Sequence, residues 1–147
     1  MIRPTVLLIS LVLILGCGQT DLDHEIIVTE GAPAAIGPYS QAVRVGRMLY
    51  LAGQIGLDPA TGQMVTGGIE AETRQVMANI QAVLTAAGYG FKHVVQVQAY
   101  LADLDDYGTF NALYGEYFGD RPPARAVVQV DRLPRNARVE VMATAVR

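Results

Sequence analysis

Hydrophobic and polar positions alternate along several stretches of the chain, and this alternation gives a first outline of the fold. Residues 94–101, 124–130 and 138–146 alternate with a period of two. That period is typical of strands with one buried side. Shorter strands are predicted at residues 25–29, 42–45 and 48–54, the last two joined by the hairpin turn Gly46-Arg47.

A second pattern, with apolar residues three and four positions apart, predicts two helices. Over residues 68–87 the apolar positions fall on one side of a helix, and Gly88 ends the pattern. The second helix is expected at about residues 106–118, with Asp103 or Asp105 as its cap. The order β-β-β-α-β-α-β-β predicts an α+β fold, with a mixed sheet of about six strands and both helices on one face.

The last two predicted strands carry the candidate chemistry. Arg125 and Glu140 fall mid-strand in the polar rows, so both are expected on the sheet face away from the helices. A rigidly held guanidinium and carboxylate can bind a substrate carboxylate and activate a water. The apolar rows, expected to face the helices, are Ala124, Ala126, Val128 and Val130, then Val139, Val141, Ala143 and Ala145.

The face away from the helices is expected to be polar without being highly charged. Aromatic residues, Met and Arg are enriched at the cores of interfaces, where other charges are depleted. We therefore expect this face to pack against further copies of the same chain. Its predicted residues are Tyr50, Ala52, Gln54, Gln96, Gln98, Tyr100, Arg125, Val127, Gln129, Glu140 and Met142.

Composition narrows the possible functions. The 147 residues favour one domain, and the formal net charge of −3 comes without the basic stripe that nucleic-acid binding requires. The single cysteine, Cys17, excludes an internal disulfide, and His24 and His93 do not form a zinc site with it. The GxSxG, P-loop and HExxH motifs are absent from the sequence.

The first residues have the pattern of an export signal. Arg3 precedes an apolar run over residues 5–15 that is too short to span a bilayer. The run leads into Gly16-Cys17 and resembles a bacterial lipobox, in which Cys17 receives a lipid; an incidental cysteine is the alternative. We expect a signal segment at 1–17, a tether at 18–24 and a folded domain at 25–147, anchored by its lipid on the periplasmic side of the cell envelope.

Several motifs occur in one order and at one set of separations that resemble the YjgF/Rid (reactive intermediate deaminase) family. The similarity extends over about residues 26–147, nearly the whole chain after the signal segment. The matching segments are APAAIGPY at 32–39, AGQI at 52–55, NALYGEYF at 111–118, PAR at 123–125, LP at 133–134 and VEVMATAV at 139–146.

The resemblance implies a chorismate-mutase-like α+β fold and a homotrimer with its sites between neighbouring subunits. It implies an enzyme of the 2-iminobutanoate/2-iminopropanoate deaminase type, which hydrolyses 2-imino acids and their enamine tautomers to 2-oxo acids and ammonia. No metal or organic cofactor is expected. The expected partners are further copies of the chain and small 2-imino or 2-oxo acids, with the membrane reached only through the lipid and no nucleic acid.

The family's functional residues carry over onto matching positions of this sequence. Arg125 would clamp the substrate carboxylate, because a planar guanidinium suits a bidentate pair. Glu140 would hold and polarise the attacking water, and Tyr39 would wall the site with its hydroxyl toward the imine. The remaining substrate-binding positions would be Asn111, Ala52, Gly53 and Val127.

Two positions depart from the family pattern. Ala52 stands where well-studied members carry a serine, and Val127 where many carry a cysteine. Each change removes a polar side chain from the expected site, so affinity or substrate range should differ. A module that binds a small carboxylate without turnover, or an envelope role in protecting proteins, are the alternative functions.

Each candidate residue also has a structural interpretation. Arg125 could be a solvated strand residue, and Glu140 could pair with Arg138 or with an arginine of another copy. Tyr39 could anchor its loop, and Asn111 could serve in helix packing.

Overall fold

The computed structural model describes residues 23–147. The predicted signal segment, Cys17 and most of the predicted tether lie outside the described residues. In chain order the elements are β1 (His24–Ile27), β2 (Ala42–Val45), β3 (Met48–Gln54), α1 (Gly68–Ala86), β4 (Val94–Leu101), α2 (Tyr107–Gly115), β5 (Ala124–Gln129) and β6 (Val139–Val146). This order is the one predicted from the alternation of polar and apolar positions.

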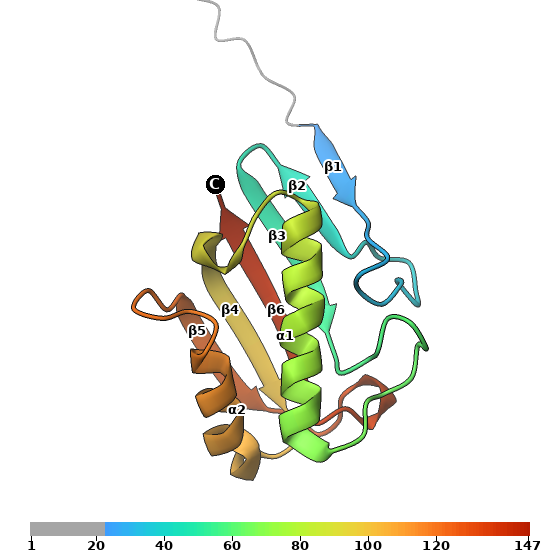
Figure 1. Cartoon of the computed structure of the whole chain (residues 1–147), viewed down its shortest axis with the longest axis vertical. Coiled ribbons are helices and arrows are strands. Elements are labelled where there is room, and N and C mark those ends of the chain that lie inside the picture. The colour runs from blue at the N-terminus through green and yellow to red at the C-terminus, as the bar shows by residue number, and fades with distance from the viewer. Residues whose placement is uncertain (1–22) are drawn as a thin grey trace, which may run out of the picture.

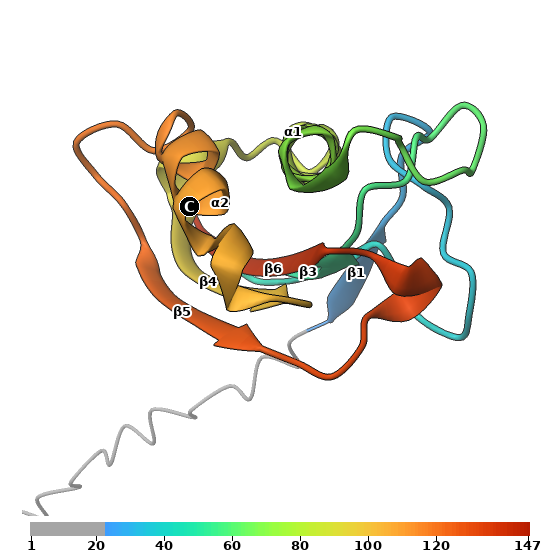
Figure 2. The same ribbon diagram turned by 90° about the horizontal axis from the view of Figure 1, so that it is seen from below.

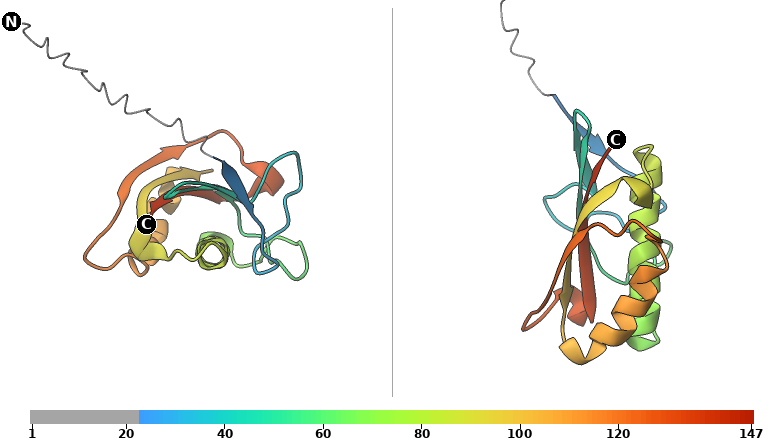
Figure 3. Two further views of the ribbon diagram at one scale, coloured as in Figure 1. Left: turned by 90° about the horizontal axis from the view of Figure 1, so that it is seen from above. Right: turned by 90° about the vertical axis from the view of Figure 1, so that its left-hand side faces the viewer.

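The strands form one six-stranded sheet in the order β1-β2-β3-β6-β4-β5. All neighbouring strands are antiparallel except β4 and β5, which run parallel. Both helices pack on one face of this sheet (Figure 1; Figure 2). Figure 3 shows that the sheet curves around α1 and α2 and that neither of these helices lies on its opposite, open face. The predicted α+β architecture is confirmed.

The hydrophobic core lies between α1 and the sheet. Helix α1 buries Val76, Ile80 and Leu84 along one side, and each is 2% exposed or less. Burying such a side chain contributes about 1.5–3 kcal/mol relative to leaving it in water. The predicted apolar row of β6 faces this helix and is confirmed as buried: Val139, Val141, Ala143 and Ala145.

The orientation predicted for β5 is wrong. Arg125 is paired with buried Val97, and Val127 with buried Ala99, so Arg125 and Val127 lie on the face covered by the helices. The alternate residues of β5, including the 45%-exposed Val128, point to the open face. Alternation did not fix the phase, because both rows of this edge strand contain small or branched apolar residues and α2 supplies partners for a covered arginine.

A bulge in β3 overturns a second prediction. Leu51 pairs with Ala143 and Gln54 pairs with Val141, so Ala52 and Gly53 together oppose one residue of β6. An extra residue of this kind reverses the facing of all residues that follow it. Gln54 therefore turns toward the helix-covered side and is only 5% exposed, instead of facing outward as predicted.

Two further features of the described residues concern membranes and metal ions. Of the helices in residues 23–147, none combines the length and apolar character that a bilayer crossing requires. The same residues contain no group of three or more His, Cys, Asp or Glu side chains placed to hold a metal ion.

Candidate functional site

Glu140 lies near the start of β6 and faces the open side of the sheet, opposite Tyr100 of β4. Its carboxyl group rests against the bulge of β3. A Cβ placed on Gly53 would lie 2.9 Å from Cδ of Glu140 and closer still to Oε1. Only glycine leaves room for the carboxylate at this point, so the bulge and Gly53 together fix where Glu140 sits.

A cavity of about 310 Å³ opens beside Glu140. Its walls include Ile36, Tyr39, Ala52, Ile55, Pro134 and the Glu140 carboxyl. Burial in these largely apolar surroundings raises the pKa of the Glu140 carboxyl above its ordinary value. A carboxyl group with a raised pKa can take and return a proton closer to neutral pH, as an acid–base catalyst must.

Gln41 shapes the same cavity, although its position in the sequence gave no sign of this. Its side chain is 3% exposed and makes hydrogen bonds to three residues of the loop before it. Oε1 accepts from the Thr29 amide at 2.7 Å, and Nε2 donates to the carbonyls of Thr29, Ala32 and Pro33 at 2.8–3.1 Å. The loop that carries Pro33 into the cavity wall is thus held by one buried amide.

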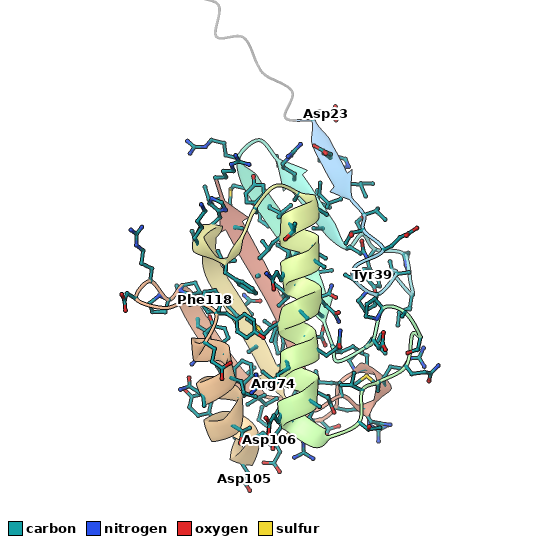
Figure 4. All side chains as sticks on the ribbon, viewed as in Figure 1. Asp23, Tyr39, Arg74, Asp105, Asp106 and Phe118 are labelled. Atoms are coloured by element: carbon teal, nitrogen blue, oxygen red, sulfur yellow. The ribbon has the colours of Figure 1, made fainter. Side chains whose placement is uncertain are left out.

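Tyr39 lies in the same loop and lines the cavity, as predicted. Its hydroxyl accepts a hydrogen bond from the Ile36 amide at 3.3 Å. The side chain is 48% exposed, so the cavity is open beside Tyr39 to solvent or to a partner. In Figure 4, Tyr39 and Phe118, which follows α2, lie on opposite sides of α1.

The second half of the candidate site surrounds Arg125, beneath α2. Nη2 of Arg125 donates to Oδ1 of Asn111 at 2.6 Å and to the hydroxyl of Tyr107 at 3.3 Å. Arg125 forms no ion pair with any residue in 23–147. No carboxylate of this part of the chain therefore neutralises its charge, and Asn111 holds one end of the guanidinium in place.

The two halves do not meet within one chain. Glu140, Tyr39, Ala52 and Gly53 border one cavity, whereas Arg125 and Asn111 contact each other on the helix-covered side. Val127 lies on the same side as Arg125 and packs against the hydrophobic core. The expected pairing of Arg125 with Glu140 on a single sheet face is therefore wrong for an isolated chain.

The interpretation of Glu140 as a partner of Arg138 is also wrong. The Arg138 guanidinium forms a two-pronged pair with Asp106, in which Nε and Nη2 each lie 2.9 Å from a carboxylate oxygen. The Arg138 amide donates to Oε2 of Glu72 at 2.7 Å. Burial raises the pKa of Glu72, and these contacts with Arg138 oppose that rise. They fix the start of β6 against α1 and against the turn that precedes α2, and they leave Glu140 unpaired within the described residues.

Comparisons with known proteins agree with this architecture. A family model described as Endoribonuclease L-PSP matches residues 29–147. The mouse protein called 2-iminobutanoate/2-iminopropanoate deaminase is 51% identical over 129 residues, which are 88% of this chain and 96% of that protein.

Solved structures are similar as well. RidA from the Antarctic bacterium Psychrobacter sp. superposes with a TM-score of 0.81 and 40% identity, covering 84% of this chain and 99% of that one. E. coli TdcF, solved with bound serine, gives a TM-score of 0.80 and 36% identity over 84% of this chain and 98% of its own. The fold that the sequence motifs implied is confirmed.

Proposed function

Because the chain belongs to the Endoribonuclease L-PSP family, also known as YjgF/Rid, we propose that it hydrolyses 2-imino acids and their enamine tautomers to 2-oxo acids and ammonia. The observation that carries the proposal is the Glu140 carboxyl, which is held by Gly53 in an apolar cavity without an ionic partner in the described chain. Relatives about half identical in sequence bear the names of such deaminases.

The reaction needs few groups. Glu140 takes a proton from a water as the water oxygen bonds to the imine carbon, and passes that proton to the imine nitrogen as the second bond of C=N opens. In the resulting carbinolamine, Glu140 moves the hydroxyl proton to the nitrogen, which leaves as ammonia when the C–N bond breaks and the carbonyl forms. The raised pKa of Glu140 suits it to accept each proton from oxygen and hand it to nitrogen. Imines already hydrolyse in water, so holding substrate and water together can supply most of the acceleration.

Substrate binding is assigned to Arg125 of a second copy of the chain. Within one chain the guanidinium lies on the sheet face opposite Glu140, so one chain cannot grip the carboxylate and activate the water together. The open face supports self-association, since its exposed side chains include Met48, Tyr50, Val128 and Met142, each 36–46% exposed. We place three such sites at the seams of a homotrimer.

The test is release of ammonia from freshly generated 2-iminobutanoate, produced from 2-aminobutanoate by an amino acid oxidase. We expect the wild-type protein to accelerate release, and Arg125→Ala and Glu140→Gln each to lower kcat/KM by at least about a hundredfold. Light scattering should give the mass of a trimer. A wild-type rate equal to that of Arg125→Ala would reject the deaminase.

A binding module without turnover is the second candidate. It is supported by Ala52, which leaves the cavity wall without a hydroxyl, and by the bound serine in TdcF. Thermal stabilisation by 2-oxobutanoate in the absence of imine hydrolysis would favour it over the enzyme. Loss of that stabilisation in Arg125→Ala separates it from a general protein-protection role.

We further propose that the protein is exported and anchored by a lipid on Cys17. The support is the charged start, the short apolar run and the lipobox-like Ile14-Leu15-Gly16-Cys17. Cell fractionation tests this: the wild-type protein should sediment with membranes, and Cys17→Ser should not. Equal distribution of the two proteins would reject the anchor.

A further inference from the structure

The guanidinium of Arg125 lies in a box of aromatic rings supplied by one face of α2. Its central carbon, Cζ, is 4.3 Å from the ring centroid of Tyr114, 5.7 Å from that of Phe110 and 5.9 Å from that of Tyr107. Tyr107, Asn111 and Tyr114 are spaced by four and three residues, which places them in a row along the helix. The shortest of these contacts, with Tyr114, is well within the range of a cation–π interaction.

Tyr114 is itself rigidly held. It is 5% exposed, and its ring packs against Phe118 with centroids 4.6 Å apart and against Phe110 with centroids 5.6 Å apart. A ring fixed by two other rings is a stable surface for a planar cation. Arg125, by contrast, comes from an edge strand and carries a long, flexible side chain that loses its freedom only through such contacts.

The polar atoms at this contact show which part of Tyr114 acts. Its hydroxyl is buried and has no hydrogen-bond partner among residues 23–147, and the same holds for Nη1 of Arg125. Burial raises the pKa of Tyr114 to about 12, so the phenol stays neutral at physiological pH. Tyr114 therefore meets the guanidinium with its ring and not with a hydrogen bond.

We propose that Tyr114 is a positioning residue for substrate binding, whose ring holds the Arg125 guanidinium in the orientation that receives the substrate carboxylate. Asn111 fixes one nitrogen of the fork, and the ring fixes its plane. The expected effect of Tyr114 on KM rests on the proposed deaminase function. The inference also stands as a statement about carboxylate binding alone.

The experiment compares Tyr114→Phe, which keeps the ring, with Tyr114→Leu, which removes it. Each is assayed with 2-iminobutanoate and with butan-2-imine, which lacks the carboxylate and is generated from 2-aminobutane by an amine oxidase. Both assays run well below the Tm of each variant. Should Tyr114→Leu fail to fold, Tyr114→Met, which is closer in volume, takes its place.

A positioning role predicts a selective loss. Tyr114→Leu should raise KM for 2-iminobutanoate by about tenfold while leaving kcat/KM for butan-2-imine within about twofold. Tyr114→Phe should restore the wild-type KM. The proposal is overturned if both substrates suffer equally, since that is the signature of a merely structural defect, or if Tyr114→Phe is as impaired as Tyr114→Leu.

Calorimetry with 2-oxobutanoate separates this proposal from the function it rests on. If the wild-type protein binds the 2-oxo acid without hydrolysing imines, the deaminase function is rejected. The role of Tyr114 is then tested by the Kd values for 2-oxobutanoate. An increase of about tenfold in Kd for Tyr114→Leu, with none for Tyr114→Phe, supports Tyr114 as a positioning residue. Equal Kd values in all three proteins, or no binding to any of them, overturn it.

Discussion

Arg125 and Glu140 point to opposite faces of the same sheet, although only β4 separates the strands that carry them. Arg125 is paired with Val97 on the helix-covered side, and Glu140 is paired with Tyr100 on the open side. This placement is the reason why we proposed that the two residues act together only between copies of the chain.

Mixing two inactive variants tests this directly. In a random equal mixture of Arg125→Ala and Glu140→Gln subunits, a site built from two chains takes an intact arginine from one and an intact glutamate from the other in about a quarter of cases. We expect ammonia release to recover to about a quarter of the wild-type rate after joint refolding. Sites built within one chain would show no recovery, and separately refolded proteins mixed afterwards are the control.

Gly53→Ala should disable the acid–base group without unfolding the protein. The added Cβ would lie 2.9 Å from Cδ of Glu140, so the carboxyl must leave its place against the bulge. We expect kcat to fall at least about tenfold, with a loss of about 1–3 kcal/mol in the free energy of unfolding.

Gly115→Ala is the matched control for that change. Gly115 lies in α2, and a Cβ there meets no atom within 4 Å. This variant should keep its kcat and gain about 0.5–1 kcal/mol of unfolding free energy. Full activity in Gly53→Ala would contradict the placement of Glu140.

Asn111→Asp should block the arginine with a charge of its own. Oδ1 of Asn111 already lies 2.6 Å from Nη2 of Arg125, so a carboxylate at this position would pair with the guanidinium and compete with the substrate. We expect KM for 2-iminobutanoate to rise by more than about tenfold. Asn111→Ala, which removes the acceptor without adding charge, should have the smaller effect; the reverse order would contradict the argument.

The stability of the protein should carry the pH signature of Glu140. Burial raises the pKa of this carboxyl, so the folded chain holds the proton more tightly than the unfolded chain. Its contribution to the free energy of unfolding is present below the unfolded pKa and is lost as pH rises through the folded pKa. The free energy of unfolding of Glu140→Gln should equal that of the wild type at about pH 4 and exceed it increasingly toward about pH 7. Urea denaturation across this range measures the difference, and a constant offset would count against it.

Gln41→Met should loosen the cavity wall. Methionine has a similar volume but leaves the Thr29 amide and the carbonyls of Ala32 and Pro33 without their partner. We expect a loss of about 2–3 kcal/mol in the free energy of unfolding, together with a higher KM. Gln63→Met, at an exposed turn position, is the control and should change neither quantity.

The elements were predictable where one side of the chain is consistently apolar. The bounds of β2, β3 and β4 and the start of α1 are those expected from the alternation, and Gly88, with φ of +79°, lies at the end of α1 as predicted. In these segments packing and local pattern select the same faces.

The sequence pointed to several residues that lie together in the structure, but not to the full arrangement. Tyr39, Ala52, Gly53 and Glu140 border one cavity, because the bulge of β3, the start of β6 and the loop that carries Tyr39 line it together. The facing of Arg125 depended on rings from α2, which are distant in sequence and leave no local periodic signal. The role of the Gln41 side-chain amide was equally unpredictable, since a single glutamine before a strand has no distinguishing neighbour pattern.

The extra residue in β3 changes which positions of this strand face the core, partway along its length. Before it, the odd-numbered residues Leu49 and Leu51 pack in the core. After it, the even-numbered Gln54 faces inward, so one short segment lines both the core and the cavity beside Glu140. Removing Ala52 would restore an unbroken ladder, in which Gly53 alone opposes Met142 and Gln54 still pairs with Val141. A shorter, more regular β3 would therefore still be a strand, but it would lose the bulge against which the Glu140 carboxyl rests.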